Sequence, residues 1–355
     1  MDINKAITFI ESSFLSPLLK DNEITDISFN GENIFYLHNL DGRKLADINV
    51  DVVEIKDFIR QIANLTDKQF SYQVPIIDVS VGKYRLNAVH QSIGRIGKET
   101  SLTFSIRIAS SLPRITDDNN FLSDELIALF EVLIKSGMSI VIGGLTGSGK
   151  TEFQKYLLRK IPENNRIILI DNVLELEQVR EQTKLDLNTW QVDDRNNNST
   201  IQELVKNALR SNPDWLIVGE ARGPEMIEVL NSAMTGHPII TTIHSIDALS
   251  MPSRMVRMVL MNEKKMSYED TMKDILYHFR FYVFLAKGED QKGPIHRRIM
   301  SLYYINENGE SDYIYRWSKN GHNYRKISQN IAEMLNFDES NHLFIKTFIK
   351  ENHYE

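Results

Sequence analysis

The segment Gly144-Leu-Thr-Gly-Ser-Gly-Lys-Thr151 carries the residue types that bind a nucleotide phosphate. It matches the pattern G-x-x-x-x-G-K-[ST] at every fixed position. The glycines let the backbone wrap an anion with several N–H groups, Lys150 neutralises charge at the β and γ phosphates, and Thr151 offers a hydroxyl to Mg²⁺. The predicted nucleotide-binding residues are therefore Gly144, Thr146, Gly147, Ser148, Gly149, Lys150 and Thr151. The motif alone does not separate ATPases, GTPases and kinases.

Two carboxylates follow apolar segments further along the chain. Asp171 ends the run Arg166–Ile170, and Glu220 follows Trp215–Val218 and one glycine. Hydrolysis of a nucleotide needs a carboxylate to orient or deprotonate water, and a second one often helps to hold Mg²⁺. An acid at the end of a strand can equally cap the next helix, so both interpretations stay open from the residues alone.

Histidine and arginine side chains are the remaining candidates for this chemistry. His244 ends the apolar run Pro238–Ile243, and His237 stands seven residues earlier. A lone histidine is more often a packed or surface residue than a functional one. Arg210 and Arg222 could stabilise a transferring phosphate, or could form an ion pair with a neighbouring acid.

The elements that must position these groups alternate between strands and helices. Four apolar runs, separated by helical segments, predict a parallel sheet that is buried on both faces. They are Met138–Ile142, Arg166–Ile170, Trp215–Val218 and Ile239–Ile243. Functional groups should then gather where the carboxyl ends of the strands meet the loops. Before the first of these runs, we expect a helix that begins after Ser123, which caps it, and that ends at Gly137.

The first hundred residues predict a smaller α+β domain. We expect helices at about 3–19 and 51–64, and strands at 24–30, 33–38, 76–81, 84–90 and 101–108. The stretch 109–120 is rich in turn-forming residues, and Pro113 disfavours helix before it. We therefore expect an N-terminal domain over 1–108, a linker over 109–120, and an α/β domain over 121–355 that ends in a helical and strand extension.

Composition narrows the class of protein. The chain has 355 residues, of which 42% are hydrophobic and 25% charged, as in an ordinary globular protein of about two domains. The net charge of −7 creates no global attraction to nucleic acid, and the absence of cysteine excludes disulfides and thiolate metal sites. The first twenty residues match neither a signal peptide nor a membrane span, and no run approaches the ~20 apolar residues that a spanning helix needs.

Several ordered motifs resemble those of the secretion ATPase superfamily, whose members drive type II secretion, type IV secretion, type IV pili and tight-adherence pili. Besides the phosphate loop, the resemblance is carried by Ala208–Gly223, Ala233–His237 and Thr241–His244, and it is strongest over about 138–260. It extends more weakly to Glu23–Gly31, Tyr84–Val89 and Ser105–Arg107. The resemblance implies a RecA-like P-loop core with a mainly parallel sheet, preceded by the smaller α+β domain.

The resemblance also implies roles for individual residues. Gly144–Thr151 corresponds to the Walker A loop, Glu220 to the Walker B acid and general base, and His244 to the residue that senses the γ-phosphate. Arg85 and Arg107 lie in segments from which the family brings arginines toward the nucleotide.

The acidic box departs from the family pattern. The usual Glu-Asp followed two residues later by Glu-Leu is here Asp171-Asn172-Val-Leu-Glu175-Leu176, so one charge is lost and the first carboxylate is shorter. We therefore assign Asp171 an auxiliary role, as a ligand of Mg²⁺ through water, and Glu220 the main catalytic role.

The favoured function is that of a cytoplasmic ATP-hydrolysing motor that uses ATP and Mg²⁺. The resemblance implies a homo-oligomer, a hexamer, which works on membrane-embedded platform proteins of a secretion or pilus machine. Two alternatives stay open at this point. One is a RecA-like translocase stimulated by nucleic acid, for which Arg254, Arg257, Lys264 and Lys265 could form a local basic patch. The other is a small-molecule phosphotransferase, which gives no reason for the segments around Glu220 and His244.

Overall fold

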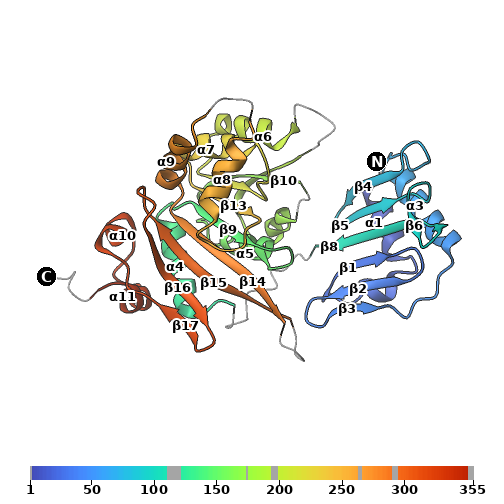
Figure 1. Ribbon diagram of the computed structural model, residues 1–355, viewed down its shortest axis with the longest axis horizontal. Helices are drawn as coiled ribbons and strands as arrows, with labels where there is room; N and C mark the ends of the chain where they lie inside the picture. The colour runs from blue at the N-terminus through green and yellow to red at the C-terminus, as the bar shows by residue number, and fades with distance from the viewer. Residues whose placement is uncertain are drawn as a thin grey trace. The chain divides into compact units, whose positions relative to one another are not determined.

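The chain divides into two compact units, which are described here one at a time (Figure 1). The computed structural model describes residues 2–109, 121–172, 175–192, 199–262, 266–289 and 295–350. One unit comprises Met1–Ser111 with Glu289–His296, and the other comprises Leu112–Gly288 with Arg297–Glu355. The expected linker 109–120 lies outside the described residues from position 110 onward.

The N-terminal unit is a six-stranded antiparallel sheet with helices on one face. The strand order is β3-β2-β1-β8-β5-β4, shown in blue and cyan in Figure 1. The elements are α1 (Ile3–Glu11), α2 (Ser16–Leu19), β1 (Ile24–Phe29), β2 (Ile34–His38), β3 (Gly42–Leu45), α3 (Val52–Leu65), β4 (Ile76–Val81), β5 (Tyr84–Val89) and β8 (Thr103–Ile108), with a separate short ribbon of β6 (Arg95–Ile96) and β7 (Glu99–Thr100). Alternate residues of β5 are buried, which places the polar side chains of Arg85 and Asn87 on the opposite face of that strand.

The single helix expected over residues 3–19 is wrong, because the chain breaks it into α1 and α2. The hydroxyl of Ser12 donates to the Thr8 carbonyl and that of Ser13 to the Ile10 carbonyl. Such local side-chain bonds compete with helix continuation, and Pro17 in the first turn of α2 has no N–H to donate.

The second unit is built on a nine-stranded, mostly parallel sheet, which confirms the predicted fold class. The strand order is β11-β10-β12-β13-β9-β14-β15-β16-β17, and the six strands from β11 to β14 in this order pair in parallel. The strands are β9 (Ile140–Gly144), β10 (Arg166–Asp171), β11 (Asp186–Gln191), β12 (Trp215–Val218), β13 (Ile239–Ile243), β14 (Phe281–Glu289), β15 (Ile295–Ile305), β16 (Ser311–Ser318) and β17 (Gly321–Tyr324).

Helices cover both faces of the parallel strands, so alternate strand residues enter two separate cores. Ile140 and Ile142 belong to a core that α4 and α5 share, and Val141 belongs to the core beneath α7 and α8. The helices are α4 (Asp124–Lys135), α5 (Lys150–Leu158), η1 (Leu176–Gln182), α6 (Ile201–Ala208), η3 (Leu209–Ser211), α7 (Met226–Met234), α8 (Met251–Val259), α9 (Tyr268–His278), α10 (Gln329–Met334) and α11 (His342–Phe348).

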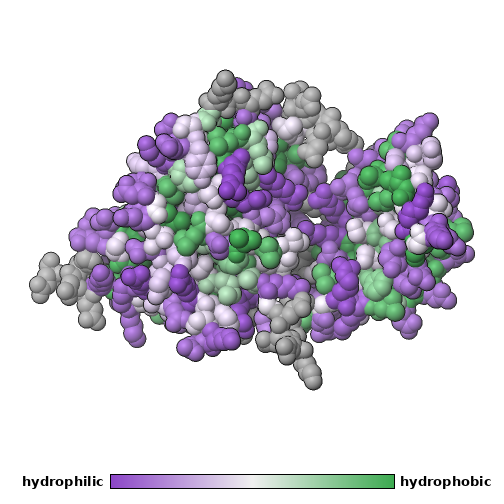
Figure 2. Space-filling model, viewed as in Figure 1, coloured by the Kyte–Doolittle hydropathy of each residue, from purple (hydrophilic) through white to green (hydrophobic). Residues whose placement is uncertain are grey.

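The expected cap of α4 is present, because the Ser123 side chain accepts a hydrogen bond from the Leu126 N–H. On the face shown in Figure 2, hydrophilic residues predominate and hydrophobic ones form small groups. Among the helices in the described ranges, none combines the length and apolarity needed to cross a bilayer.

Candidate active site

The phosphate loop connects the carboxyl end of β9 to the first turn of α5. Lys150 begins that helix, and its ammonium donates to the carbonyl oxygens of Gly144 (2.9 Å) and Leu145 (3.2 Å). Gly147 and Gly149 have φ angles of 78° and 95°, a region in which only glycine is unstrained. Thr151 follows Lys150 in the first turn, and its side chain is partly buried.

Close packing explains the first glycine of the loop. A Cβ atom on Gly144 would lie 2.5 Å from the Leu285 carbonyl oxygen and 2.5 Å from the Ser148 hydroxyl. Ser148 is itself fully buried, and its hydroxyl has no hydrogen-bond partner among the described residues. The loop is therefore pressed against β14, and any larger residue at 144 would displace it.

Glu220 and His244 meet beside the loop. Glu220 follows β12 and His244 follows β13, which lies between β12 and β9 in the sheet. His244 Nε2 is 2.8 Å from Glu220 Oε1, and Arg222 Nη2 donates to Glu220 Oε2 at 2.6 Å. Of the two roles left open for Arg222, the ion pair with a neighbouring acid is the one observed.

The environment of His244 favours its neutral form. Burial is the largest cause that lowers the pKa of His244 below its ordinary 6.5, and the positive charge of Lys150 lowers it further. The Glu220 carboxylate opposes this shift, while Arg222 and Arg254 add to it. Near neutral pH the imidazole can therefore donate one N–H and accept at its other nitrogen.

Buried hydrogen bonds tie the loop helix to the strands that carry these two groups. Gln154 lies one turn after Lys150 and is 1% exposed. Its Nε2 donates to the carbonyl oxygens of Val218 (3.0 Å) and Ile240 (3.2 Å), on β12 and β13. Thr242 donates to the Gly219 carbonyl at 2.8 Å, directly before Glu220. These bonds set the spacing between the phosphate loop and the carboxylate.

Asp171 ends β10, the strand next to β12 on the side away from the loop. Its carboxylate lies against Gly219, where a Cβ atom would come within 2.6 Å of Oδ1. Asp171 therefore contacts the backbone just before Glu220. Asn172 is described, whereas residues 173–174 of the acidic box lie outside the described ranges.

The comparisons with known proteins point to one group. Residues 103–276 match the family described as "Type II/IV secretion system protein". The VirB11 type IV secretion system protein of Bartonella henselae is 24% identical over 302 residues, which cover 74% of this chain and 83% of that protein. Over residues 103–276 the chain is therefore similar to type II and type IV secretion system proteins.

Two further groups of relatives and one solved structure are also similar to this chain. An uncharacterised protein of Bacillus anthracis is 29% identical over 308 residues, which cover 84% of this chain and 68% of that protein. The chain spans 51% and 36% of two uncharacterised proteins of Methanocaldococcus jannaschii. The X-ray structure of the Legionella pneumophila ATPase DotB shares the fold, with a TM-score of 0.60 at 22% identity over 83% of this chain and 80% of that chain.

Arg85 and Arg107 are direct cross-strand partners on β5 and β8. Arg85 makes two hydrogen bonds to Asp78, from Nε to Oδ1 at 3.2 Å and from Nη2 to Oδ2 at 2.9 Å. Both arginines belong to the N-terminal unit and the phosphate loop belongs to the other, so their contact with nucleotide stays a prediction.

The remaining sequence candidates are not part of the Glu220–His244 ion pair, although the charge of Arg254 reaches His244 and lowers its pKa. Arg210 is exposed on η3, and His237 Nδ1 lies 3.0 Å from the Thr235 hydroxyl. Arg254 and Arg257 are exposed on α8, while Lys264 and Lys265 lie outside the described residues.

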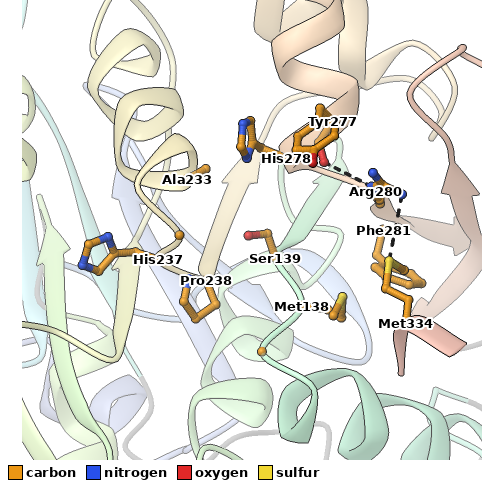
Figure 3. A pocket seen from close by; sticks show the side chains of 12 residues that line it. Met138, Ser139, Ala233, His237, Pro238, Tyr277, His278, Arg280, Phe281 and Met334 are labelled. Atoms are coloured by element: carbon orange, nitrogen blue, oxygen red, sulfur yellow. Dashed lines mark hydrogen bonds between the residues drawn. The ribbon is translucent and has the colours of Figure 1, made fainter. Parts of the chain in front are cut away.

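A cavity of about 260 Å³ opens at the amino ends of β9, β13 and β14, the edge opposite the phosphate loop (Figure 3). His237, His278 and Arg280 are among its lining residues. Arg280 donates to the Tyr277 carbonyl at 3.1 Å and contacts the Met334 sulfur, as the dashed lines in Figure 3 show. None of the predicted catalytic residues lines this cavity.

Two residues of the site, Gln154 and Arg297, are not among the candidates that the sequence indicated. Arg297 Nε donates to the Gly147 carbonyl oxygen at 2.9 Å, across 150 residues of sequence. No motif marked either residue, because both act on backbone carbonyls that only the fold brings near.

Proposed function

We propose that the chain binds ATP with Mg²⁺ at Gly144–Thr151 and hydrolyses it with Glu220 as general base. The observation that carries the proposal is the close approach of Glu220 to His244, 2.8 Å, just past the ends of β12 and β13, of which β13 is the neighbour of β9. A carboxylate held at this edge can take a proton from the water that attacks the γ-phosphorus. The products are ADP and inorganic phosphate, and the proton leaves from Glu220.

The residues of the loop fit a nucleotide phosphate and its metal. Lys150 now bonds two carbonyl oxygens, and a phosphate of higher charge competes for the same ammonium. Thr151 offers a hydroxyl oxygen, the ligand type that Mg²⁺ prefers, and Asp171 would act through water. When bound, Mg²⁺ neutralises charge on the β and γ phosphate oxygens.

His244 would act on the γ-phosphate from the strand between Glu220 and the loop. Its pKa is held below the ordinary value, so at neutral pH it donates a hydrogen bond without adding a full positive charge. Arg222 holds the other oxygen of Glu220, which orients the carboxylate. Arg85 and Arg107 would bring positive charge toward the nucleotide when the two units approach.

The expected work is that of a motor. We infer that residues 1–108 and 121–355 act as two domains, joined by the linker 109–120, and that nucleotide turnover moves one against the other. By similarity to VirB11 of type IV secretion, the motor would power a type IV secretion, type II secretion or pilus machine. It would act as a hexamer in the cytoplasm, associated with the membrane through platform proteins and without direct nucleic-acid binding.

Glu220→Gln tests the catalytic assignment. The amide keeps the shape of the side chain but takes no proton, so ATP binding should stay within about threefold of wild type while turnover falls at least about a hundredfold. Lys150→Ala should weaken ATP binding and also reduce turnover. The matched control is Glu225→Gln, whose amide oxygen can still accept from the Arg222 and Gly223 N–H groups. Wild-type turnover in Glu220→Gln would refute the assignment.

The oligomer can be tested with the same variant. Glu220→Gln with ATP and Mg²⁺ should trap the assembled ring, which mass photometry would detect as six chains of 41.1 kDa each. Monomers alone under these conditions would contradict the ring. Membrane proteins that co-purify with the trapped form would identify the machine.

A further inference from the structure

The C-terminal strands form one wall of the phosphate loop. β14 pairs in parallel with β9, and Leu285 stands opposite Gly144 at the point where the loop begins. β15 is the next strand of the sheet and carries Arg297. The extension after the parallel core therefore reaches the loop through both strands.

Arg297 bonds the apex of the loop. Leu145 to Ser148 form a turn, in which the Ser148 N–H donates a hydrogen bond to the Leu145 carbonyl oxygen at 3.2 Å. Gly147, the third residue of the turn, has the positive φ of 78° that a type II turn requires. Arg297 Nε donates to the Gly147 carbonyl at 2.9 Å.

The hydrogen bond from Arg297 restrains the whole peptide unit between Gly147 and Ser148. The Gly147 carbonyl and the Ser148 N–H share one rigid plane and point in opposite directions. A donor that holds the carbonyl outward therefore keeps the N–H turned inward and the turn closed. A closed turn restricts the φ and ψ angles of its residues, and it thereby limits the directions of the neighbouring loop N–H groups that a bound phosphate would use.

We propose that Arg297 is a positioning residue for the phosphate loop, which it braces in the conformation that binds nucleoside di- and triphosphates. The inference rests on the proposed function, because it assumes that the loop binds nucleotide. Arg297 acts through the Gly147 carbonyl, so its loss should lower affinity for phosphate-bearing ligands and leave the Glu220 chemistry in place.

Arg298 provides a matched control on the same strand. Its guanidinium lies over the ring of Trp317, 4.3 Å from the centroid. Arg297→Gln and Arg298→Gln remove the same charge from adjacent positions. A general electrostatic effect would weaken binding in both variants, whereas bracing of the loop would weaken it only in Arg297→Gln.

The experiment measures ADP and ATP affinity by calorimetry, adenosine affinity by competition, and the kcat and KM of hydrolysis. Arg297→Gln should weaken ADP and ATP about tenfold, as expected for the loss of one charge-assisted hydrogen bond at a partly exposed site. In Arg297→Gln, KM should rise while kcat stays within about threefold of its wild-type value, and the affinity for adenosine should not change. Arg298→Gln should match wild type in all of these quantities.

Three results would overturn the proposal while the proposed function stands: affinities in Arg297→Gln within twofold of wild type, equal losses in both glutamine variants, or an equal loss for adenosine. A wild-type chain that binds no ADP or ATP would instead remove the proposed function itself. If Arg297→Gln does not fold, Arg297→Lys decides, with an expected loss of about threefold because the ammonium lacks the Nε donor.

Discussion

Gln154→Glu should destabilise the unit that contains the parallel sheet, by an amount that depends on pH. Gln154 is 1% exposed, and its Nε2 donates to two strand carbonyls at 3.0 and 3.2 Å. A carboxylate of the same shape would place unpaired negative charge against these oxygens. Burial and the carbonyls should therefore raise the pKa of the new side chain far above the ordinary value of about 4.3.

The size of the effect follows from protonation. At pH 7.5 the side chain must take up a proton about three units above its ordinary pKa, which costs about 4 kcal/mol at ~1.4 kcal/mol per unit. The protonated acid can donate to only one of the two carbonyls, so a further cost of about 1 kcal/mol remains. Because the folded-state pKa is raised, the deficit relative to wild type should shrink as pH falls, to about 2 kcal/mol at pH 5.

Urea unfolding followed by tryptophan fluorescence measures this prediction. All three tryptophans, Trp190, Trp215 and Trp317, lie in the unit that contains Gln154. The exposed Gln329 provides the control, since Gln329→Glu should change stability by less than about 0.5 kcal/mol. A deficit below about 1 kcal/mol at pH 7.5, or one that does not shrink at pH 5, would refute the two hydrogen bonds.

Three further predictions concern single contacts. Gly144→Ala should lower the melting temperature and abolish nucleotide binding, because its methyl group would lie 2.5 Å from the Leu285 carbonyl; unchanged ADP affinity by calorimetry would contradict this. Burial lowers the pKa of His278 below 6.5, so its contribution to stability is complete above pH 6.5 and is lost as pH falls. Measured by urea unfolding, the free energy of unfolding should fall less between pH 7.5 and pH 5.5 for His278→Gln than for wild type, and equal decreases would contradict this prediction. Arg222→Ala should reduce turnover by less than tenfold, since the side chain is 60% exposed and orients Glu220 from solvent; a loss as large as that of Glu220→Gln would show a direct catalytic role.

Much of the fold could be predicted from local pattern. The apolar runs that end near Ile142, Ile170, Val218 and Ile243 became β9, β10, β12 and β13. Continuous burial on both faces leaves few alternatives to a parallel sheet for such short runs. The helix expected over 3–19 failed because serine hydroxyls and a proline broke it, which hydrophobic periodicity does not register.

The sequence by itself identified the groups that could do chemistry: a phosphate loop, two carboxylates and a histidine, each at or within two residues of the end of an apolar run. The sequence could not predict the order of the strands in the sheet, because β13 lies between β12 and β9 there although β9 comes before both of them in the chain. Only the tertiary structure decided that His244 meets Glu220 and that Gln154 joins their strands across 64 and 86 residues. It also decided that Arg297 bonds the loop from 150 residues away. Backbone carbonyls are present at every residue, so a sequence carries no sign of which ones a distant side chain will reach.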